Sequence, residues 1–211
     1  MKKGDRSMRR LVTGLVLALG AAGCAAATQV DGGEGESLRS GAAEADVRFM
    51  QHMLVHHAQA LEMTALVAPR SEWRGLHLLA ERIEVSQQDE IAMMERWLRE
   101  RKEDVPNWRG QHAGHGGGNG DHAHMPGMLT PEQLERLAAA QGADFDRLFL
   151  EYMIQHHQGA LVMVAELFAA PGAAQEAETF QIASEIDADQ RVEIERMRRL
   201  RGAMPAGAER R

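Results

Sequence analysis

The chain has 211 residues, with 24 Lys and Arg, 31 Asp and Glu, a formal net charge of −7 and a single cysteine. This length suits one medium domain, or two small halves that share a core. The negative charge argues against binding to nucleic acid or to an anionic membrane surface, and a lone cysteine excludes an intramolecular disulfide framework.

The first 23 residues are predicted to be a lipoprotein signal peptide. Basic residues precede the apolar run LVTGLVLALGAA, which is too short to span a bilayer but suits a signal-peptide core. The small residues before Cys24 resemble a bacterial lipobox, which implies cleavage there, lipidation of the Cys24 sulfur and export to the cell envelope. Secretion with a free thiol is the alternative. Without residues 1–23 the chain carries 19 basic and 30 acidic residues, a net charge of −11 that would attract cations.

The remaining chain is predicted to be all-α, with the bundle domain at 44–201. Residues 24–43 are small, polar and Gly-rich, which predicts a flexible tether. Apolar positions at steps of three and four then predict helices over 44–68 and 71–102, which form a first hairpin at 44–103. A loop is predicted at 104–129, and a second hairpin at 130–201 contains a short capped helix to about residue 141 and helices over 144–169 and 173–201. The tail 202–211 is expected to be disordered.

The chain contains an internal repeat. MLVHHAQALEM at 53–63 recurs as MIQHHQGALVM at 153–163, an offset of 100 residues. The second helix of each half also matches, at an offset of 103, where Gln87 and Glu90 align with Gln190 and Glu193. Two helical hairpins of similar sequence most simply pair into a pseudo-symmetric four-helix bundle.

The repeated segment places histidines and methionines on neighbouring stripes of a helix, because residues three, four or seven positions apart share a face. Imidazole and thioether are soft-to-borderline ligands that suit copper better than magnesium or calcium, and thioethers favour Cu(I). Adjacent histidines point about 100° apart, so we expect one to face the bundle interior and the other its edge, where the partner helix could reach it. The predicted ligands are His52, Met53, His56, His57, Met63, Met153, His156, His157 and Met163. Packing is the alternative, since methionine often fills helix cores.

The connecting loop holds a second cluster of ligand-type side chains. Its members are His112, His115, His122, His124, Met125 and Met128. Such a cluster can wrap a cation without a preformed site, and the ordering entropy predicts weaker or less selective binding than in the bundle. A solvated Gly/His linker is the alternative.

The two HHxxA-L helices, the MPGMLTPEQL segment and GADFDRLFLEYMIQHHQGALVM resemble the bacterial domain-of-unknown-function 305 family over residues 46–201. The resemblance implies a ferritin-like helical bundle that is usually exported. Some members are associated with copper binding and resistance, which implies copper ligation by the paired His-His and Met positions of this chain.

The predicted function is copper sequestration or delivery outside the cytoplasm, without catalysis. The copper can be Cu(I) or Cu(II), and other soft or borderline cations can compete. A di-iron oxidase is disfavoured because no glutamate is followed three residues later by a histidine, as such sites require. A partner-binding envelope module without metal is the other alternative. The sequence is compatible with a monomer or a homodimer.

Overall fold

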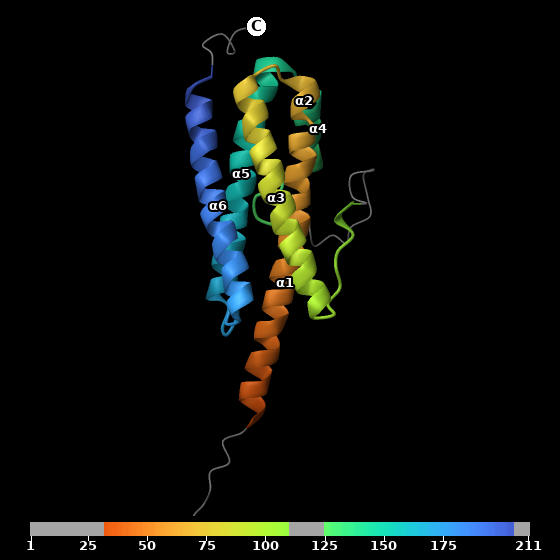
Figure 1. Cartoon of the computed structure of the whole chain (residues 1–211), viewed down its shortest axis with the longest axis vertical. Coiled ribbons are helices and arrows are strands. Elements are labelled where there is room, and N and C mark those ends of the chain that lie inside the picture. The colour runs from red at the N-terminus through yellow and green to blue at the C-terminus, as the bar shows by residue number, and fades with distance from the viewer. Residues whose placement is uncertain (1–31, 110–124, 205–211) are drawn as a thin grey trace, which may run out of the picture. The chain divides into compact units, whose positions relative to one another are not determined.

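The computed structural model describes residues 32–109 and 125–204, with side chains from residue 43, and these residues form six helices and no strand (Figure 1). The helices are α1 (Gly32–Ala65), α2 (Val67–Arg70), α3 (Arg74–Glu100), α4 (Pro131–Ala139), α5 (Gly142–Ala169) and α6 (Ala177–Gly202). The predicted all-α fold is therefore confirmed. The predicted signal peptide and Cys24 lie outside the described residues, as does the end of the tail.

Four long helices run side by side as two antiparallel hairpins, α1 with α3 and α5 with α6 (Figure 1). The two hairpins meet where α6 packs along α3, and where His156 Nε2 on α5 donates to the backbone carbonyl of His56 on α1. The two halves are similar hairpins, and α1 and α5 run in opposite directions, so the halves form a pseudo-symmetric pair (Figure 1). The predicted ferritin-like bundle of two repeated hairpins is confirmed.

Two helix boundaries differ from the expectation. α1 begins at Gly32, inside the stretch predicted as a tether, although its apolar periodicity starts only near Glu44. Residues 42–45 read Ala-Ala-Glu-Ala, which are strong helix formers, so the helix can propagate towards the N-terminus from its packed part. α1 also ends at Ala65, and Pro69 lies in the separate short helix α2.

The start of α4 agrees with the sequence. Thr130 is the N-cap, and its hydroxyl accepts a hydrogen bond from the Gln133 backbone N–H at 3.3 Å. The Gln133 side chain accepts from the Thr130 N–H at 2.9 Å in return, which completes the capping box.

Asp46 and Asp146 occupy equivalent positions in the two repeats, and each lies at the turn of the opposite hairpin. Asp46 on α1 accepts a hydrogen bond of 2.8 Å from the backbone N–H of Ala174, between α5 and α6. Ala174 has φ of 53°, a conformation that costs energy for a residue with a Cβ, so this bond helps to hold the turn. Asp146 on α5 lies beside Ser71, just after α2.

The interior consists of two apolar clusters with polar residues between them. Phe49, Trp97 and Ile186 belong to the first cluster, and Ile83, Phe145 and Met197 belong to the second. On α1 and on α5, the His-His pair comes between the residues of one cluster and those of the other. The histidines therefore interrupt an otherwise continuous apolar core.

The segment 125–129 returns from the loop and is anchored to α1 and α5. The Gln59 side chain on α1 both donates to the Leu129 carbonyl at 3.1 Å and accepts from the Leu129 N–H at 2.7 Å. On α5, a Cβ added to Gly159 would lie 2.0 Å from the Pro126 carbonyl oxygen. Only glycine allows this approach of two backbones. None of the described helices is long and apolar enough to cross a membrane.

Replacing Gly159 with alanine should destabilise the protein by about 2–4 kcal/mol, because the new methyl group would push segment 125–129 off α5. Gly202 is the matched control, since a Cβ there meets nothing within 4 Å. We expect Gly202→Ala to change the free energy of unfolding by less than about 0.5 kcal/mol. Urea unfolding followed by circular dichroism would measure both, and equal stabilities of the two variants would contradict the backbone contact.

Candidate metal centre

Four histidines meet where α1 and α5 pass each other. The rings of His56 and His156, one from each repeat, lie 3.8 Å apart between centroids. His57 and His157 follow on either side, with ring centroids 6.3 Å and 6.1 Å from those of their sequence neighbours. All four side chains are buried, with exposed fractions of 1% or less. One histidine of each pair is indeed reached by the partner helix, His57 by α3 and His157 by α6, and neither of them is exposed.

Both histidines of a pair are buried because packing partners lie in both directions. His57 faces α3, where its Nε2 is 2.5 Å from Glu90 Oε2, and His157 faces α6, where its Nε2 is 2.6 Å from Glu193 Oε2. His56 lies under segment 125–129, and its Nε2 is 3.0 Å from the Pro126 carbonyl oxygen. An angular separation of 100° thus leads to two different buried partners and not to solvent.

The hydrogen bonds determine which ring nitrogen carries the proton. A carbonyl oxygen only accepts, so Nε2 of His56 and Nε2 of His156 must donate, at 3.0 Å each, to Pro126 and to His56 respectively. Nδ1 of a neutral ring then keeps its lone pair. The contacts of His57 with Glu90 and of His157 with Glu193 do not fix the tautomer in this way, because a carboxyl group can donate when protonated and accept when ionised.

Three of the Nδ1 atoms have no partner. Nδ1 of His56, of His57 and of His157 is buried and makes no hydrogen bond within the described residues. A buried polar atom without a partner costs free energy, so its retention calls for an explanation. A ring whose one nitrogen donates to a carboxylate or carbonyl while the other is open is the usual state of a metal-ligating histidine.

The electrostatics favour neutral histidines. Burial, together with neighbouring His57, lowers the pKa of His56 to about 3, and burial together with His157 lowers the pKa of His57 to about 3. Burial and His56 also hold the pKa of His156 well below its usual range. All three rings are then neutral at neutral pH, which is the form that binds a metal.

Glu90 is electrostatically crowded. Burial, with the nearby carboxylates of Glu193 and Asp189, raises the pKa of Glu90 to about 8. The Glu90–His57 contact is thus a buried hydrogen bond and not an ordinary ion pair of two charged groups. A cation bound near these carboxylates would relieve their mutual repulsion.

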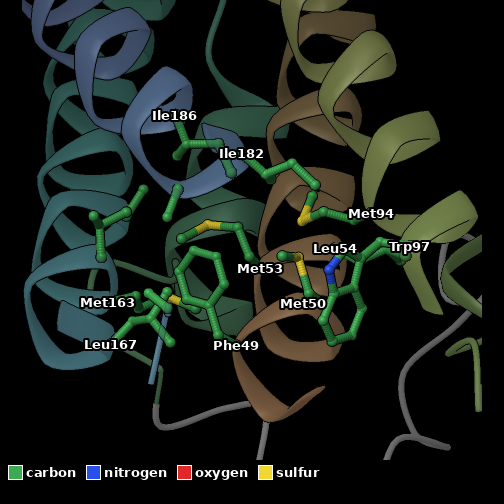
Figure 2. Close-up of a cluster of buried hydrophobic side chains, with 14 of the residues drawn as sticks. Phe49, Met50, Met53, Leu54, Met94, Trp97, Met163, Leu167, Ile182 and Ile186 are labelled. Carbon is green, nitrogen blue, oxygen red and sulfur yellow. The ribbon is translucent and has the colours of Figure 1, made fainter. Parts of the chain in front are cut away.

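The four predicted methionines flank the histidines in crosswise pairs. Met53 and Met163 belong to the first apolar cluster, and Met63 with Met153 to the second, so each cluster takes one methionine from each repeat. Figure 2 shows Met53 and Met163 among the apolar side chains of the first cluster, near Phe49. All four are buried, with exposed fractions of 6% or less. They therefore fill the core, and their thioethers lie on both sides of the histidine layer.

The remaining predicted ligands divide into two groups. His52 is half-buried, and it lines a groove of about 360 Å³ together with Met125 and Met163. Met128 packs against the first cluster. The loop histidines His112, His115, His122 and His124 lie outside the described residues.

No three His, Cys, Asp or Glu side chains among the described residues converge on one point that could hold a metal ion. The histidines alone are therefore not a complete preformed site. Ligation here needs the methionine sulfurs or a small side-chain rearrangement, which suits a protein that takes up and releases an ion.

The sequence reasoning missed the residues that hold the histidine rings. Glu90 and Glu193 are buried, with exposed fractions of 3% and 4%, and Gln87 and Gln190 lie one turn before them with exposed fractions of 1%. The repeat did contain a signal, because both pairs recur at the offset of 103 on the buried stripe of α3 and α6. Polar residues that recur at core positions indicate a buried network.

Comparisons with known proteins agree on the family. The family model described as Domain of unknown function (DUF305) matches residues 46–201. The crystal structure of a DUF305 fragment from Deinococcus radiodurans is 32% identical, with a TM-score of 0.64 over 76% of this chain and 97% of that chain. A DUF305 protein from Streptomyces coelicolor, described as secreted, is 27% identical, with a TM-score of 0.62 over 75% and 94%.

A third solved relative contains metal. CopM in its Cu(II)-bound form is 28% identical, with a TM-score of 0.59 over 76% of this chain and 97% of that chain. CopM has also been solved in Cu(I)-bound and silver-bound forms. Among curated proteins, none matches the chain.

The metal-free protein should be most stable near pH 6.5. The unfolded chain protonates its histidines near pH 6.5, whereas folded His56 and His57 do so only near pH 3. Between these values the unfolded state binds more protons, so stability falls as the pH falls, by roughly 1.4 kcal/mol per pH unit for each of these histidines. Glu90 acts in the opposite sense between pH 4.5 and about 8, where the folded state holds the extra proton and stability falls as the pH rises.

Thermal melts in the presence of a chelator, from pH 4.5 to 8.5, would measure this profile. Between pH 4.5 and 6.5 the three histidines and Glu90 act in opposite senses. Because His56, His57 and His156 outnumber Glu90, the Tm should fall as the pH falls below 6.5. Glu90→Gln should remove much of the decline above pH 6.5. A Tm that rises between pH 6.5 and 5 would contradict neutral buried histidines.

Proposed function

The chain belongs to the DUF305 family, and we propose that it is a copper-binding protein that works outside the cytoplasm, where it sequesters or delivers the ion. The observation that carries this proposal is the set of three buried Nδ1 atoms without a partner, on rings whose Nε2 atoms are already held by oxygen. Binding of a metal at Nδ1 satisfies these atoms and leaves every Nε2 hydrogen bond in place.

The methionines supply the preference for copper. Thioethers are weak ligands for zinc or magnesium but good ligands for Cu(I), and Met53, Met63, Met153 and Met163 flank the histidine layer on α1 and α5. Imidazole nitrogen also suits Cu(II). The centre can thus accept both oxidation states, with nitrogen common to both and sulfur more important for Cu(I).

The relatives support the same assignment. CopM is 27–28% identical to this chain and has been solved with Cu(I), Cu(II) and silver bound. The Streptomyces relative is described as secreted, which agrees with a signal peptide at residues 1–23. Lipidation at Cys24 would keep this protein at the cell envelope, and the loop histidines would capture ions or pass them on.

We propose cargo binding and not catalysis. The carboxyl groups of the bundle interior, Glu90 and Glu193, each hydrogen-bond to a histidine Nε2 and support the orientation of the ring. Fe(II) binding with oxygen consumption would instead support a ferritin-like oxidase. Absence of stabilisation by any metal would support a partner-binding module.

The double variant His57→Gln, His157→Gln should bind copper more than about 100-fold more weakly. Loss of a residue that only supports a ligand already costs about 10–100-fold, and this variant loses two ligands. Glutamine keeps an amide N–H near the position of Nε2, so the bond to Glu90 or Glu193 persists while the Nδ1 ligand is lost. Competition titrations with Cu(I) and Cu(II) chelators, with thermal melts of apo and loaded protein, would measure the effect.

His77→Gln is the matched control for this experiment. His77 is also a helical histidine with Nε2 held by a carbonyl, that of Ser71 at 2.7 Å, but it lies at the start of α3, away from the centre. We expect the copper affinity of the His77→Gln variant to match that of the unchanged protein. Full copper binding by the double glutamine variant would move the chemistry away from the bundle.

The double variant Met53→Leu, Met153→Leu should distinguish binding of Cu(I) from binding of Cu(II). The change nearly conserves volume, so the cost to stability should stay under about 1.5 kcal/mol per site. We expect Cu(I) affinity to fall at least about tenfold while Cu(II) affinity changes little, because only Cu(I) depends on sulfur. Met94→Leu, at a buried site in the first cluster without a role in the motif, is the control. Equal losses for both ions would argue against thioether ligation.

A further inference from the structure

A large groove on the described part of the protein lies between α3 and α6. It has a volume of about 680 Å³. Six carboxylate side chains line it, and they are Glu81, Asp89, Glu90, Glu185, Asp189 and Glu193. Only two cationic side chains, Arg82 and Arg196, line it with them. Burial raises the pKa of Glu90, but the other five carboxylates still outnumber the two arginines, so the groove is negative, and a concave surface of one charge concentrates ions of the other.

The floor of this groove contains a buried oxygen without a partner. Glu90 has an exposed fraction of 3%, and its Oε2 is occupied by His57, but its Oε1 makes no hydrogen bond. The amide groups of Gln87 and Gln190 do not line the groove, but they lie one turn before Glu90 and Glu193 on the same helix faces and are also buried and unpartnered. A carboxylate oxygen and amide oxygens are ligands for a hydrated divalent cation.

The floor also leads directly to the histidines. Glu90 and Glu193 line the groove, and each is hydrogen-bonded to a histidine of the metal centre. The histidine rings themselves are almost fully buried, so an ion from solvent must pass another side chain to reach them. One carboxylate separates the groove from His57, and one separates it from His157.

A second groove also approaches the centre but carries a different charge. Its lining includes Pro126, whose carbonyl accepts from His56, and its charged groups are Arg48 and Glu166, of opposite sign. It therefore lacks the excess negative charge that attracts a divalent cation. The two grooves differ in chemistry, with carboxylates in one and His52, Met125 and Met163 in the other.

We propose that the groove between α3 and α6 docks a hydrated divalent cation and is the route by which Cu(II) reaches His57 and His157. The docking stands by itself, whereas the route rests on the proposed copper function. Asp89, Asp189, Glu81 and Glu185 attract the ion with its water shell, and Glu90 and Glu193 replace part of that shell. Their contacts with His57 and His157 then bring the ion to the Nε2 side of the rings whose Nδ1 atoms are the proposed ligands.

Docking can be tested without copper. Mn(II) at substoichiometric amounts, added to the full chain labelled with ¹⁵N, should broaden backbone amide signals around residues 89 and 189 first. Asp89→Asn combined with Asp189→Asn should abolish this selective broadening, and because both residues are exposed the fold should persist. Glu166→Gln, which neutralises the carboxylate of the second groove, should leave it unchanged. Broadening that is uniform, or centred elsewhere, would overturn the docking site.

The route is tested by the rate of Cu(II) uptake. Stopped-flow fluorescence, with quenching of Trp97 and the other tryptophans as the signal, should show uptake by the double asparagine variant slowed roughly tenfold at low ionic strength, or about threefold per charge. The difference should shrink with added salt, the final stoichiometry should not change, and uptake of monovalent silver should slow less. Glu166→Gln should take up Cu(II) at the rate of the unchanged protein.

The outcomes separate the two proposals. Mn(II) docking with no copper uptake by the unchanged protein would remove the copper function and the route but leave the cation site. Normal copper uptake at equal rates in all variants would keep the function and overturn the route. Slower uptake in Glu166→Gln than in the double asparagine variant would place the route at the second groove instead.

Discussion

The structure depends on the contact of two buried histidines where α1 and α5 pass each other. Each of these two rings, and each of the neighbouring rings of His57 and His157, must find an oxygen partner for its Nε2, because a buried polar atom without a partner costs about 1–3 kcal/mol. The oxygens come from four places: Glu90 on α3, Glu193 on α6, the His56 backbone and Pro126 in segment 125–129. The histidine layer therefore specifies how both hairpins and the returning segment are positioned.

The internal repeat acquires a physical meaning in this arrangement. Because α1 and α5 run in opposite directions, the first methionine of one repeat shares a cluster with the last methionine of the other. Thioethers from both halves thus lie above and below the same histidine layer. Methionine contributes to packing whether or not a metal is bound, so a core built in this way tolerates loss of the ion.

The layer retains polar atoms that folding alone does not use. Three Nδ1 atoms, Glu90 Oε1 and the amides of Gln87 and Gln190 are buried without partners. A core chosen for stability would replace these groups with apolar side chains, and apart from Asp146 Oδ1 the unpartnered buried side-chain atoms of the described residues lie around this one layer. Such departures concentrate at functional sites, and here the open atoms have the chemistry of cation ligands.

The sequence by itself determined the helices, the capping box at Thr130, the two hairpins and the repeated His and Met positions, because periodicity and capping are local properties of the chain. It also contained Glu90 and Glu193 as a recurrent pair, but only the tertiary structure decided that they hold His57 and His157. Likewise, helix geometry places adjacent histidines about 100° apart, yet their burial depends on which elements lie in each direction. Those elements, α3 for His57 and segment 125–129 for His56, are 33 and 70 residues away in the chain. Contacts over such separations follow from how whole helices pack, and no local pattern encodes them.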